Sequence, residues 1–395
     1  MRILTRYVLA ELGKVFFLSL AALTPMLGII LVVDKALDQG LPPAQVFQLT
    51  PYILPEALLF AVPVTLLLAT TNVYSRMSGC YEVVAVKSLG IFPMAILWPT
   101  LIVAFLLSLG TVVLNDVAVS WGRDGVRRVI IESIEEIAYG KLRTQGRFSS
   151  SSFDITVMDV KDHRLIRPTL TIKKQGTAPP GTISAREALL RFDRKESMLK
   201  IVLYDATVVL EGGYEGSFPD VEEYEIPLGD PHEGDITSKS PSSLPLCVIP
   251  GERTRQQSEI ERCEQALAAR AAFQMVSGDF DGLLSPEWKT RHRVLKNERG
   301  RLHRLRTEPF RRWAAGFSCL CFAFVGAPMA IWLRNRDFLT SFFLCFAPIL
   351  IVYYPAMAYT VDAAKAGRFP PLTVWTGNLI LLLWGAYLLR KVLRY

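Results

Sequence analysis

Long stretches without charged side chains alternate with charged and polar segments along this chain. Six stretches contain no Asp, Glu, Lys or Arg and approach the roughly 20 residues that a helix needs to cross a hydrocarbon core of about 30 Å. They are residues 15–33, 57–73, 91–114, 313–333, 338–361 and 369–389. The pattern predicts six transmembrane helices. The first run is expected to remain as an anchor, because it exceeds the apolar part of a cleaved signal and no small-residue cleavage site follows it.

Between residue 147 and about residue 228 the apolar positions recur with a period of two. Short β-branched runs at 153–157, 169–172 and 199–203 are separated by turn residues, a pattern typical of half-buried strands. Residues 188–201 predict a hairpin with a polar turn, and residues 211–214 predict another turn. This part of the chain is therefore expected to form a small all-β domain.

Residues 230–250 are rich in Pro, Ser, Gly and Asp and are predicted to be a linker. The residues after this linker show a third sequence pattern. Residues 252–275 and 286–306 are charged and helical in composition. Their apolar residues recur at seven-residue spacing, with Ile260 and Leu267 on the first arm and Trp288, Leu295 and Leu302 on the second. Residues 277–282 supply a turn, so the two arms predict an antiparallel helical hairpin.

Charge in the short loops predicts how the spans are oriented. One set of loops and termini carries Arg2, Arg6, Arg76, Lys87, Arg334, Arg336, Arg390, Lys391 and Arg394. The short loops of the other set hold only Lys35, Lys365 and Arg368. Because basic loops are retained on the cytoplasmic side, we expect a multi-pass inner-membrane protein with both termini cytoplasmic and residues 115–312 in a periplasm.

Composition agrees with a chain that is partly in lipid and partly in water. It is 51% hydrophobic and 21% charged over 395 residues, with a net charge of +7. No aromatic-basic motif accompanies that charge, so nucleic-acid binding is not expected. The region 286–312 alone holds ten Lys and Arg against three Glu. This basic arm predicts either contact with phosphorylated lipid headgroups or a solvated helix face, and the sequence leaves both open.

The expected organisation has four parts. Residues 1–115 form helices 1–3, with a cytoplasmic helix at about 75–90. Residues 116–250 form a periplasmic, jellyroll-like β-domain and its linker, and residues 251–308 form the helical hairpin. Residues 309–395 form helices 4–6. The expected fold class is thus a polytopic α-helical membrane protein with a β-domain and a hairpin inserted between helices 3 and 4.

The segment between the second and third spans is a candidate for receiving motion from a soluble motor. Residues 74–90 are short and amphipathic, with Val83, Val84 and Val86 facing lipid or neighbouring spans and Glu82 left to meet a basic or polar groove. A plain loop with a solvated Glu82 has the same periodicity, so the residues alone leave that alternative open.

These features together resemble the LptF/LptG permease family of the lipopolysaccharide-export ABC transporter. The resemblance rests on a Glu followed by an apolar helix and a Gly, on the acid-base pair after the first span, and on motifs at the last three spans. The matching residues are Glu82 and Gly90, Asp34 and Lys35 with Gln39 and Gly40, Leu302, His303, Arg304 and Pro309, Gly326 to Pro328, Tyr353 and Tyr354, Pro370, Pro371, Trp375 and Asn378. Arg301 stands where the family usually has an acidic residue, and the hairpin is longer than usual.

The resemblance implies a mechanism and a set of partners. Two such permeases, of one kind or two, would surround a cavity and bind a cytoplasmic ABC ATPase dimer similar to LptB. ATP binding would close the dimer, and the cavity would narrow to push lipopolysaccharide, or a related phosphorylated glycolipid, toward the β-domain. A periplasmic β-jellyroll bridge protein similar to LptC or LptA would receive it. No cofactor is expected on this chain, because ATP would be bound and hydrolysed by the partner.

The resemblance also assigns roles to particular residues. Glu82, with Arg76 and Tyr81, would contact the ATPase. Lys35, beside Asp34 at the outer end of the first span, would pair with the phosphates of the lipid. An ammonium at a cavity rim avoids full burial. Interfacial snorkelling of Lys35 is the alternative reading.

Two rival functions come from other classes. A membrane-bound enzyme would need converging ligands or a nucleophile with a base, and the four histidines, His163, His232, His292 and His303, have no zinc-site spacing. A mechanotransducing scaffold, in which the hairpin acts on a partner protein, would leave Lys35 dispensable. Cys247 and Cys263 fall in the expected oxidising compartment, where they could pair.

Overall fold

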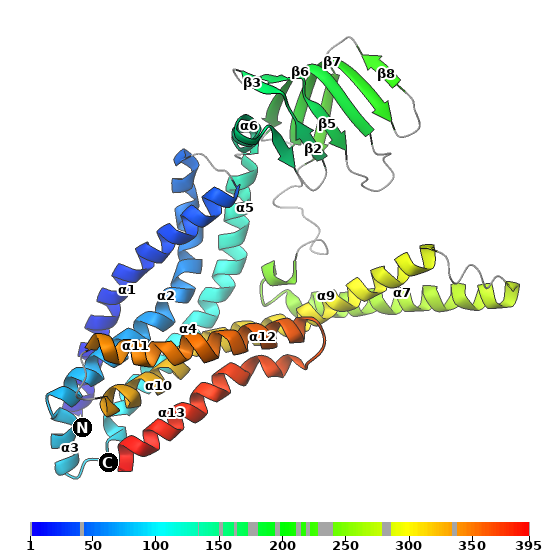
Figure 1. Cartoon of the computed structure of the whole chain (residues 1–395). Helices are drawn as coiled ribbons and strands as arrows, with labels where there is room; N and C mark the ends of the chain where they lie inside the picture. Colours follow the sequence, from blue (N-terminus) through cyan, green and yellow to red (C-terminus); the bar gives the residue numbers. More distant parts are fainter. Residues whose placement is uncertain are drawn as a thin grey trace. The chain divides into compact units, whose positions relative to one another are not determined.

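The chain divides into two compact units, which are described separately (Figure 1). The computed structural model describes residues 2–39, 43–132, 134–149, 153–161, 164–172, 181–193, 198–210, 215–218, 222–227, 240–278, 286–333 and 338–394. The span unit comprises residues 1–27, 54–120 and 239–395, and the sheet unit comprises residues 28–53 and 121–238.

Six helices within the described residues are long and apolar enough to cross a membrane, as the charge-free runs predicted. Three spans precede the insert: α1 (Arg2–Gln39), α2 (Pro43–Gly79) and α4 (Met94–Val117), with the short α3 (Glu82–Ser88) between the last two. The fourth span is built from α9 (Pro286–Gly316) and α10 (Ser318–Trp332), and the fifth from α11 (Phe338–Pro348), a π-turn (Ile349–Tyr353) and α12 (Tyr354–Lys365). A 3₁₀ turn (Pro371–Trp375) leads into α13 (Thr376–Arg394).

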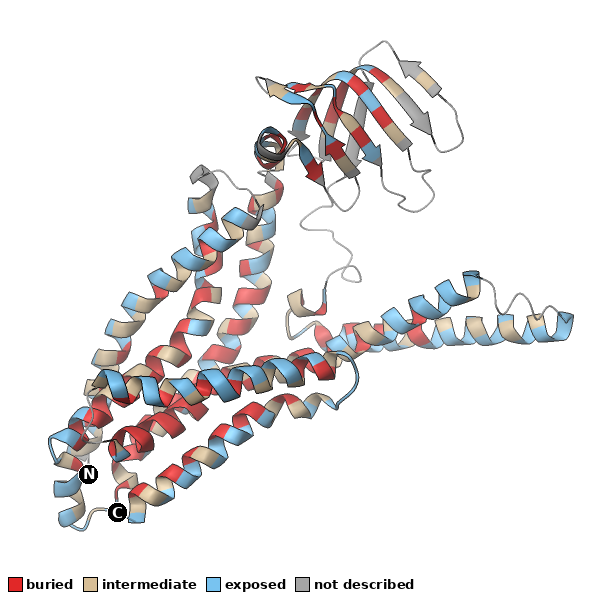
Figure 2. Cartoon of the chain, in the orientation of Figure 1, coloured by how far each residue is buried: buried red, intermediate tan, exposed pale blue. Residues whose placement is uncertain are grey.

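The fourth span is the centre of packing in the span unit. Figure 2 shows α10 largely buried, with 12 of its side chains from Ser318 to Ile331 in the buried class. Small residues let the neighbouring helices approach, since a Cβ at Gly316 would lie 2.3 Å from the Val112 side chain and one at Gly385 2.5 Å from Phe324. Membrane helices commonly use small residues at such contacts, because lipid supplies no hydrophobic force to join them.

The helical hairpin is confirmed. Its arms are α7 (Ile249–Ser277) and α9, and its seam holds Ile260, Leu295 and Leu302, which the seven-residue spacing had placed together. Gln256 on α7 donates a hydrogen bond of 2.5 Å to Glu298 on α9. Gly278 ends α7 with a φ of 72°, which glycine adopts without steric cost. Residues 279–282 of the predicted turn lie outside the described residues.

Cys247 and Cys263 do not form a disulfide. Both carry free thiols, with Cys247 exposed and Cys263 half-buried. Cys263 packs against the hairpin seam as a small apolar side chain. The described part of the linker, residues 240–248, contains one 3₁₀ turn (Pro241–Ser243) before α7 begins.

The sheet unit contains a nine-stranded antiparallel sheet, which confirms the predicted β region. Its strands are β1 (Arg147–Ser149), β2 (Phe153–Thr156), β3 (Asp159–Lys161), β4 (Arg164–Ile166), β5 (Thr169–Ile172), β6 (Gly181–Asp193), β7 (Met198–Leu210), β8 (Glu215–Phe218) and β9 (Glu222–Pro227). The order is β1-β2-β5-β6-β4-β3, and β7 pairs with β6, β8 and β9. β6 and β7 form the expected hairpin, in which Leu190 faces Ile201. The turn at 211–214 lies outside the described residues, and jellyroll closure stays a prediction.

Two helices in the sheet unit were not predicted from the sequence: α5 (Arg123–Glu132) and α6 (Ile134–Gln145). α6 is fixed to the sheet by Tyr139, whose hydroxyl accepts a 2.9 Å hydrogen bond from the Leu190 N–H and donates to the Leu190 carbonyl. Burial raises the pKa of Tyr139 above its ordinary value, which keeps this hydroxyl protonated and able to donate.

A test of the small-residue packing is the substitution Gly316→Ala. The added methyl group would meet the Val112 side chain and, at 3.1 and 3.2 Å, the backbone of α4 at Val112 and Ser108. Overpacking of this kind costs about 1–3 kcal/mol, so we expect a lower melting temperature in detergent. Gly110→Ala is the matched control, because nothing lies within 4 Å of its Cβ. Equal melting temperatures for the two variants would contradict this packing.

Candidate functional site

The first candidate region is the end of the span unit that carries both termini and α3 (Figure 1). The chain enters α3 through Tyr81, a non-glycine residue with a φ of 58° that turns the backbone sharply after α2. Tyr81 is 61% exposed, and Glu82 follows it in the first turn of α3. Gly90, with a φ of 74°, lies just beyond the far end. The helix expected between Glu82 and Gly90 is present as α3, and Tyr81 directly precedes it. Of the cytoplasmic segment expected to be helical at about 75–90, residues 75–79 belong to α2.

Two of the predicted coupling residues are held by α1. The Tyr7 hydroxyl on α1 donates to Glu82 Oε1 at 3.4 Å. Arg76, near the end of α2, donates to Glu11 Oε2 at 2.8 Å, and Lys14 also reaches Glu11. Glu82 and Arg76 thus both contact α1, Glu82 through Tyr7 and Arg76 through Glu11. Sequence reasoning missed Tyr7 and Glu11, since nothing local links them to a segment more than 60 residues away.

The inner face of α3 is fixed to the spans. Val83 is buried in an apolar cluster that includes Val8 of α1, Ile96 of α4 and Ala330 of α10. Next to it, the Ser78 hydroxyl donates to the Ile331 carbonyl at 3.0 Å, and Lys87 Nζ donates to the Val392 carbonyl at 2.8 Å. Displacement of α3 would therefore load α1, α4, α10 and α13 at once.

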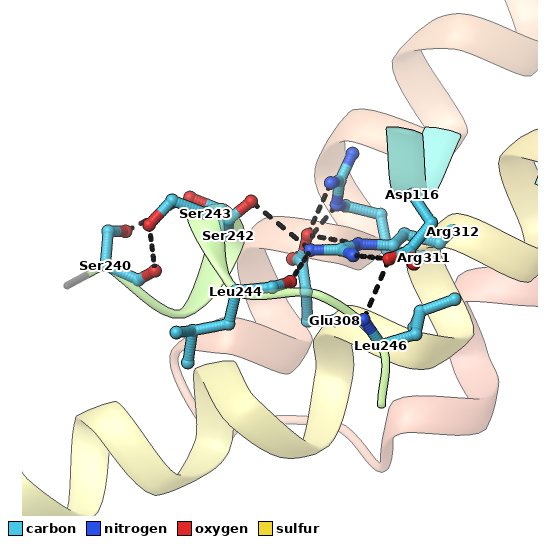
Figure 3. A network of polar contacts seen from close by, with 9 residues as sticks. All are labelled: Asp116, Ser240, Ser242, Ser243, Leu244, Leu246, Glu308, Arg311 and Arg312. Carbon is cyan, nitrogen blue, oxygen red and sulfur yellow. Dashed lines mark hydrogen bonds and ion pairs between the residues drawn. The ribbon is translucent and has the colours of Figure 1, made fainter. Parts of the chain in front are cut away.

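The second candidate region is a buried ionic cluster around Arg312, the residue of α9 that directly precedes the fourth charge-free run. Arg312 is fully buried, and Figure 3 shows its guanidinium group between two carboxylates and two backbone carbonyls. Its Nη1 donates to Asp116 Oδ1 at 3.0 Å, and its Nε donates to Glu308 Oε1 at 3.3 Å. Its Nη2 donates to the carbonyls of Leu244, at 2.7 Å, and Ser242, at 3.3 Å.

Other contacts complete this Arg312 cluster. Asp116 also accepts a hydrogen bond from the Leu246 N–H at 2.8 Å, and Glu308 is a bidentate partner of Arg311. Two residues further along α9, the Ala314 carbonyl accepts a hydrogen bond from the buried Asn378 on α13 at 2.8 Å. The cluster therefore joins α4, α9 and segment 240–246, and Asn378 extends the connection to α13.

A polar hollow of about 360 Å³ lies next to the Arg312 cluster. It is lined by Ser240, Pro241, Ser242, Arg304, Glu308, Asp362, Lys365 and Ala366. Two cations and two carboxylates face it, and Arg311 and Arg312 already pair with Glu308. Its mixed charge suits a polar group better than an acyl chain. This hollow was not predicted, because its walls come from three chain segments that are far apart in the sequence.

The predicted lipid-binding pair lies in the other compact unit. Asp34 and Lys35 belong to the part of α1 within the sheet unit, where Asp34 is exposed and Lys35 is half-buried. The exposed Asp34 beside the half-buried Lys35 is compatible with the predicted position of Lys35 at the rim of a lipid cavity. Arg312, Asp116 and Glu308 were not among the predicted site residues.

The structure offers little for metal chemistry within the residues it describes. Across those ranges no group of three or more His, Cys, Asp or Glu side chains is arranged to hold a metal ion. The polar contacts of both candidate regions are hydrogen bonds and ion pairs between helices, which suit mechanical connection.

Replacement of Arg312 by Gln tests the ionic cluster. The change would remove the buried cation between Asp116 and Glu308, leaving Glu308 its pair with Arg311, and would offer two N–H donors where Arg312 makes four hydrogen bonds. Breaking a buried pair typically costs about 3–5 kcal/mol. We expect a fall in melting temperature and poor recovery of folded protein in detergent. Arg304→Gln, on the exposed face of the same helix, is the control. A melting temperature for R312Q as high as that for R304Q would show that the cluster does not stabilise the unit.

The sequence matches the model of a known protein family. A family model described as "Lipopolysaccharide export system permease LptF/LptG" matches residues 6–391, nearly the whole chain. No curated protein matched the sequence. With six helices able to span a bilayer, the match indicates a multi-pass inner-membrane protein, and the chain belongs to the LptF/LptG family of lipopolysaccharide-export permeases.

Proposed function

We propose that this chain is one permease subunit of an ABC transporter that extracts lipopolysaccharide, or a related phosphorylated glycolipid, from the inner membrane. A second LptF/LptG-type permease would pair with it, and a separate ATPase dimer would bind and hydrolyse ATP. The lipid would then pass through a periplasmic β-jellyroll bridge protein toward the outer membrane. Family membership supports the general role, and the contacts of α3 support the motor connection.

The single observation that carries the proposal is the set of contacts that holds α3 against the transmembrane helices. A seven-residue helix has too few internal hydrogen bonds to be stable alone, yet this one is held by Val83, Lys87 and the Tyr7–Glu82 contact. The other side of α3 leaves Val84 45% exposed, and Leu89, which directly follows the helix, is 75% exposed. A helix with one side packed on the spans and exposed residues on the other is suited to pass force from a soluble ATPase.

Orientation follows from the same reasoning about charge. The end of the span unit with α3 also holds Arg76, Lys87, Lys391 and both termini. Because basic loops are retained on the cytoplasmic side, we place α3 in the cytoplasm and the hairpin in the periplasm. The sheet unit would then lie in the periplasm, where a jellyroll-like form could take up the lipid and offer a strand edge to the bridge protein.

Lys35 is proposed to bind the phosphates of the lipid. An ammonium group near an anionic surface contributes about 1 kcal/mol of attraction. The half-buried position of Lys35 leaves a part of its side chain in reach of a ligand. Asp34 beside it would limit the local positive charge and favour release.

The substitution Glu82→Arg tests the motor contact. Reversing a charge at a docked ion pair costs at least about 2 kcal/mol, which is more than tenfold in affinity. We expect the ATPase to be lost when the tagged chain is purified from its native membranes and the bound proteins are identified by mass spectrometry. Glu261→Arg, an exposed charge reversal on α7, is expected to retain it.

The result is informative in both directions. Retention of the ATPase by the Glu82→Arg variant would exclude Glu82 from the contact, and absence of any ATPase from the unmodified chain would refute the transporter proposal itself. Melting temperatures of both variants must match that of the unmodified chain, because Glu82 also accepts a hydrogen bond from Tyr7.

The substitution Lys35→Gln tests the lipid contact. It removes one cation while keeping a hydrogen-bonding side chain of similar length, so we expect about fivefold less phosphorylated glycolipid bound per protein. Mass spectrometry of lipids extracted from the purified protein measures the ratio. Lys14→Gln, on an exposed part of the same helix, should leave the ratio unchanged. Equal lipid content in the two variants would assign Lys35 an interfacial role only.

A further inference from the structure

A second hollow, of about 340 Å³, lies between α3, α10 and α13 at the end of the span unit that carries the termini (Figure 1). It is lined by Ser78, Val83, Val84, Lys87, Ile331, Trp332, Lys391 and Val392. Two of these residues are lysines, and among these described lining residues none is a carboxylate. Among the residues that the structure describes, the hollow is therefore a local concentration of positive charge.

The two lysines are positioned by contacts that leave capacity for a ligand. Lys87 Nζ donates one hydrogen bond to the Val392 carbonyl at 2.8 Å, and an ammonium group has three N–H donors. Lys391 Nζ lies 4.2 Å from the centre of the Trp332 ring. A cation held over an aromatic face keeps its charge and can still face an anion. Both ammonium groups are thus held in place without being neutralised by these partners.

Apart from Ser78, the remaining walls are apolar. Val83, Val84, Ile331 and Val392 supply branched side chains around the lysines. Trp332 is the penultimate residue of the fourth charge-free run, and Lys391 follows the sixth run by two residues. Trp and Lys at such positions mark the boundary between hydrocarbon and headgroups. A ligand there would have an anionic group beside an apolar part.

We propose that this hollow binds the phosphate of an anionic membrane phospholipid, with its glycerol and first acyl carbons against the valines. Basic pockets between transmembrane helices are known to hold such headgroups. The apolar walls and the interfacial level favour a lipid over a soluble anion. Because the hollow is bounded by α3 and α13, the lipid would bridge these two helices. The inference stands on the hollow alone and does not depend on the proposed transport function.

The test uses the full chain in detergent and native mass spectrometry, with phosphatidylglycerol and phosphatidylcholine of identical acyl chains as probes. We expect phosphatidylglycerol to be retained more tightly than phosphatidylcholine. Lys87→Gln and Lys391→Gln should each weaken its binding about fivefold, which is about 1 kcal/mol per basic residue. Lys14→Gln, which removes an exposed lysine outside the hollow, should leave binding unchanged.

A second variant guards against loss of folding in the lysine substitutions. Val84→Trp keeps both lysines but fills the hollow from α3, where Val84 is 45% exposed, and it should displace the lipid at an unchanged melting temperature. Equal retention of the two lipids, or phosphatidylglycerol binding by K87Q and K391Q like that by K14Q, would overturn the proposal. Inorganic phosphate binding as tightly as the lipid would overturn it too, by showing a simple anion site.

Discussion

The arrangement of the span unit depends on one buried guanidinium group. Arg312 is fully buried at the start of the fourth charge-free run, where a lone charge would cost several kcal/mol. Asp116, Glu308 and the carbonyls of Ser242 and Leu244 use all three of its nitrogens. The same contacts fix where α4 ends, where α9 enters the apolar region and where segment 240–246 rejoins the spans. Satisfying one charge therefore determines the relative placement of three chain segments.

The charge-free part of the fourth span, which is the most buried span, begins directly after Arg312. Below Arg312, the helix continues through Gly316 into α10, whose neighbours approach closely at Gly316, Gly326 and Gly385. Asn378 on α13 donates to the Ala314 carbonyl, only two residues from Arg312. Ionic contacts position the top of the fourth span, and small residues then allow α2, α4 and α13 to pack along its length. Along the fourth span, the ionic contacts of Arg312 are thus followed by close apolar contacts at small residues.

How much of this the sequence could predict depends on the range of the interaction. The six spans were found because hydrocarbon excludes charges over about 20 residues, a local rule. Strands such as β2 and β5 and the seam residues Leu295 and Leu302 were found from local periodicity. The helix between Glu82 and Gly90 was expected from the family resemblance, because periodicity alone left a plain loop open. Arg312 was counted only as one of ten basic residues, because its partner Asp116 is 196 residues away. Its position gave no distinguishing signal, since Arg368 also directly precedes a charge-free run and is exposed.

The two ends of the span unit differ in the kind of contact they use, and this difference bears on how force would travel. At the Arg312 end the contacts are buried ion pairs, whose disruption costs about 3–5 kcal/mol. At the α3 end they are the partly exposed Arg76–Glu11 ion pair and hydrogen bonds such as those of Ser78 and Lys87 to carbonyls. Such hydrogen bonds contribute about 0.5–1.5 kcal/mol for a neutral donor and about 1.5–3 kcal/mol for a charged one. A push on α3 would therefore rearrange its own contacts before those of Arg312.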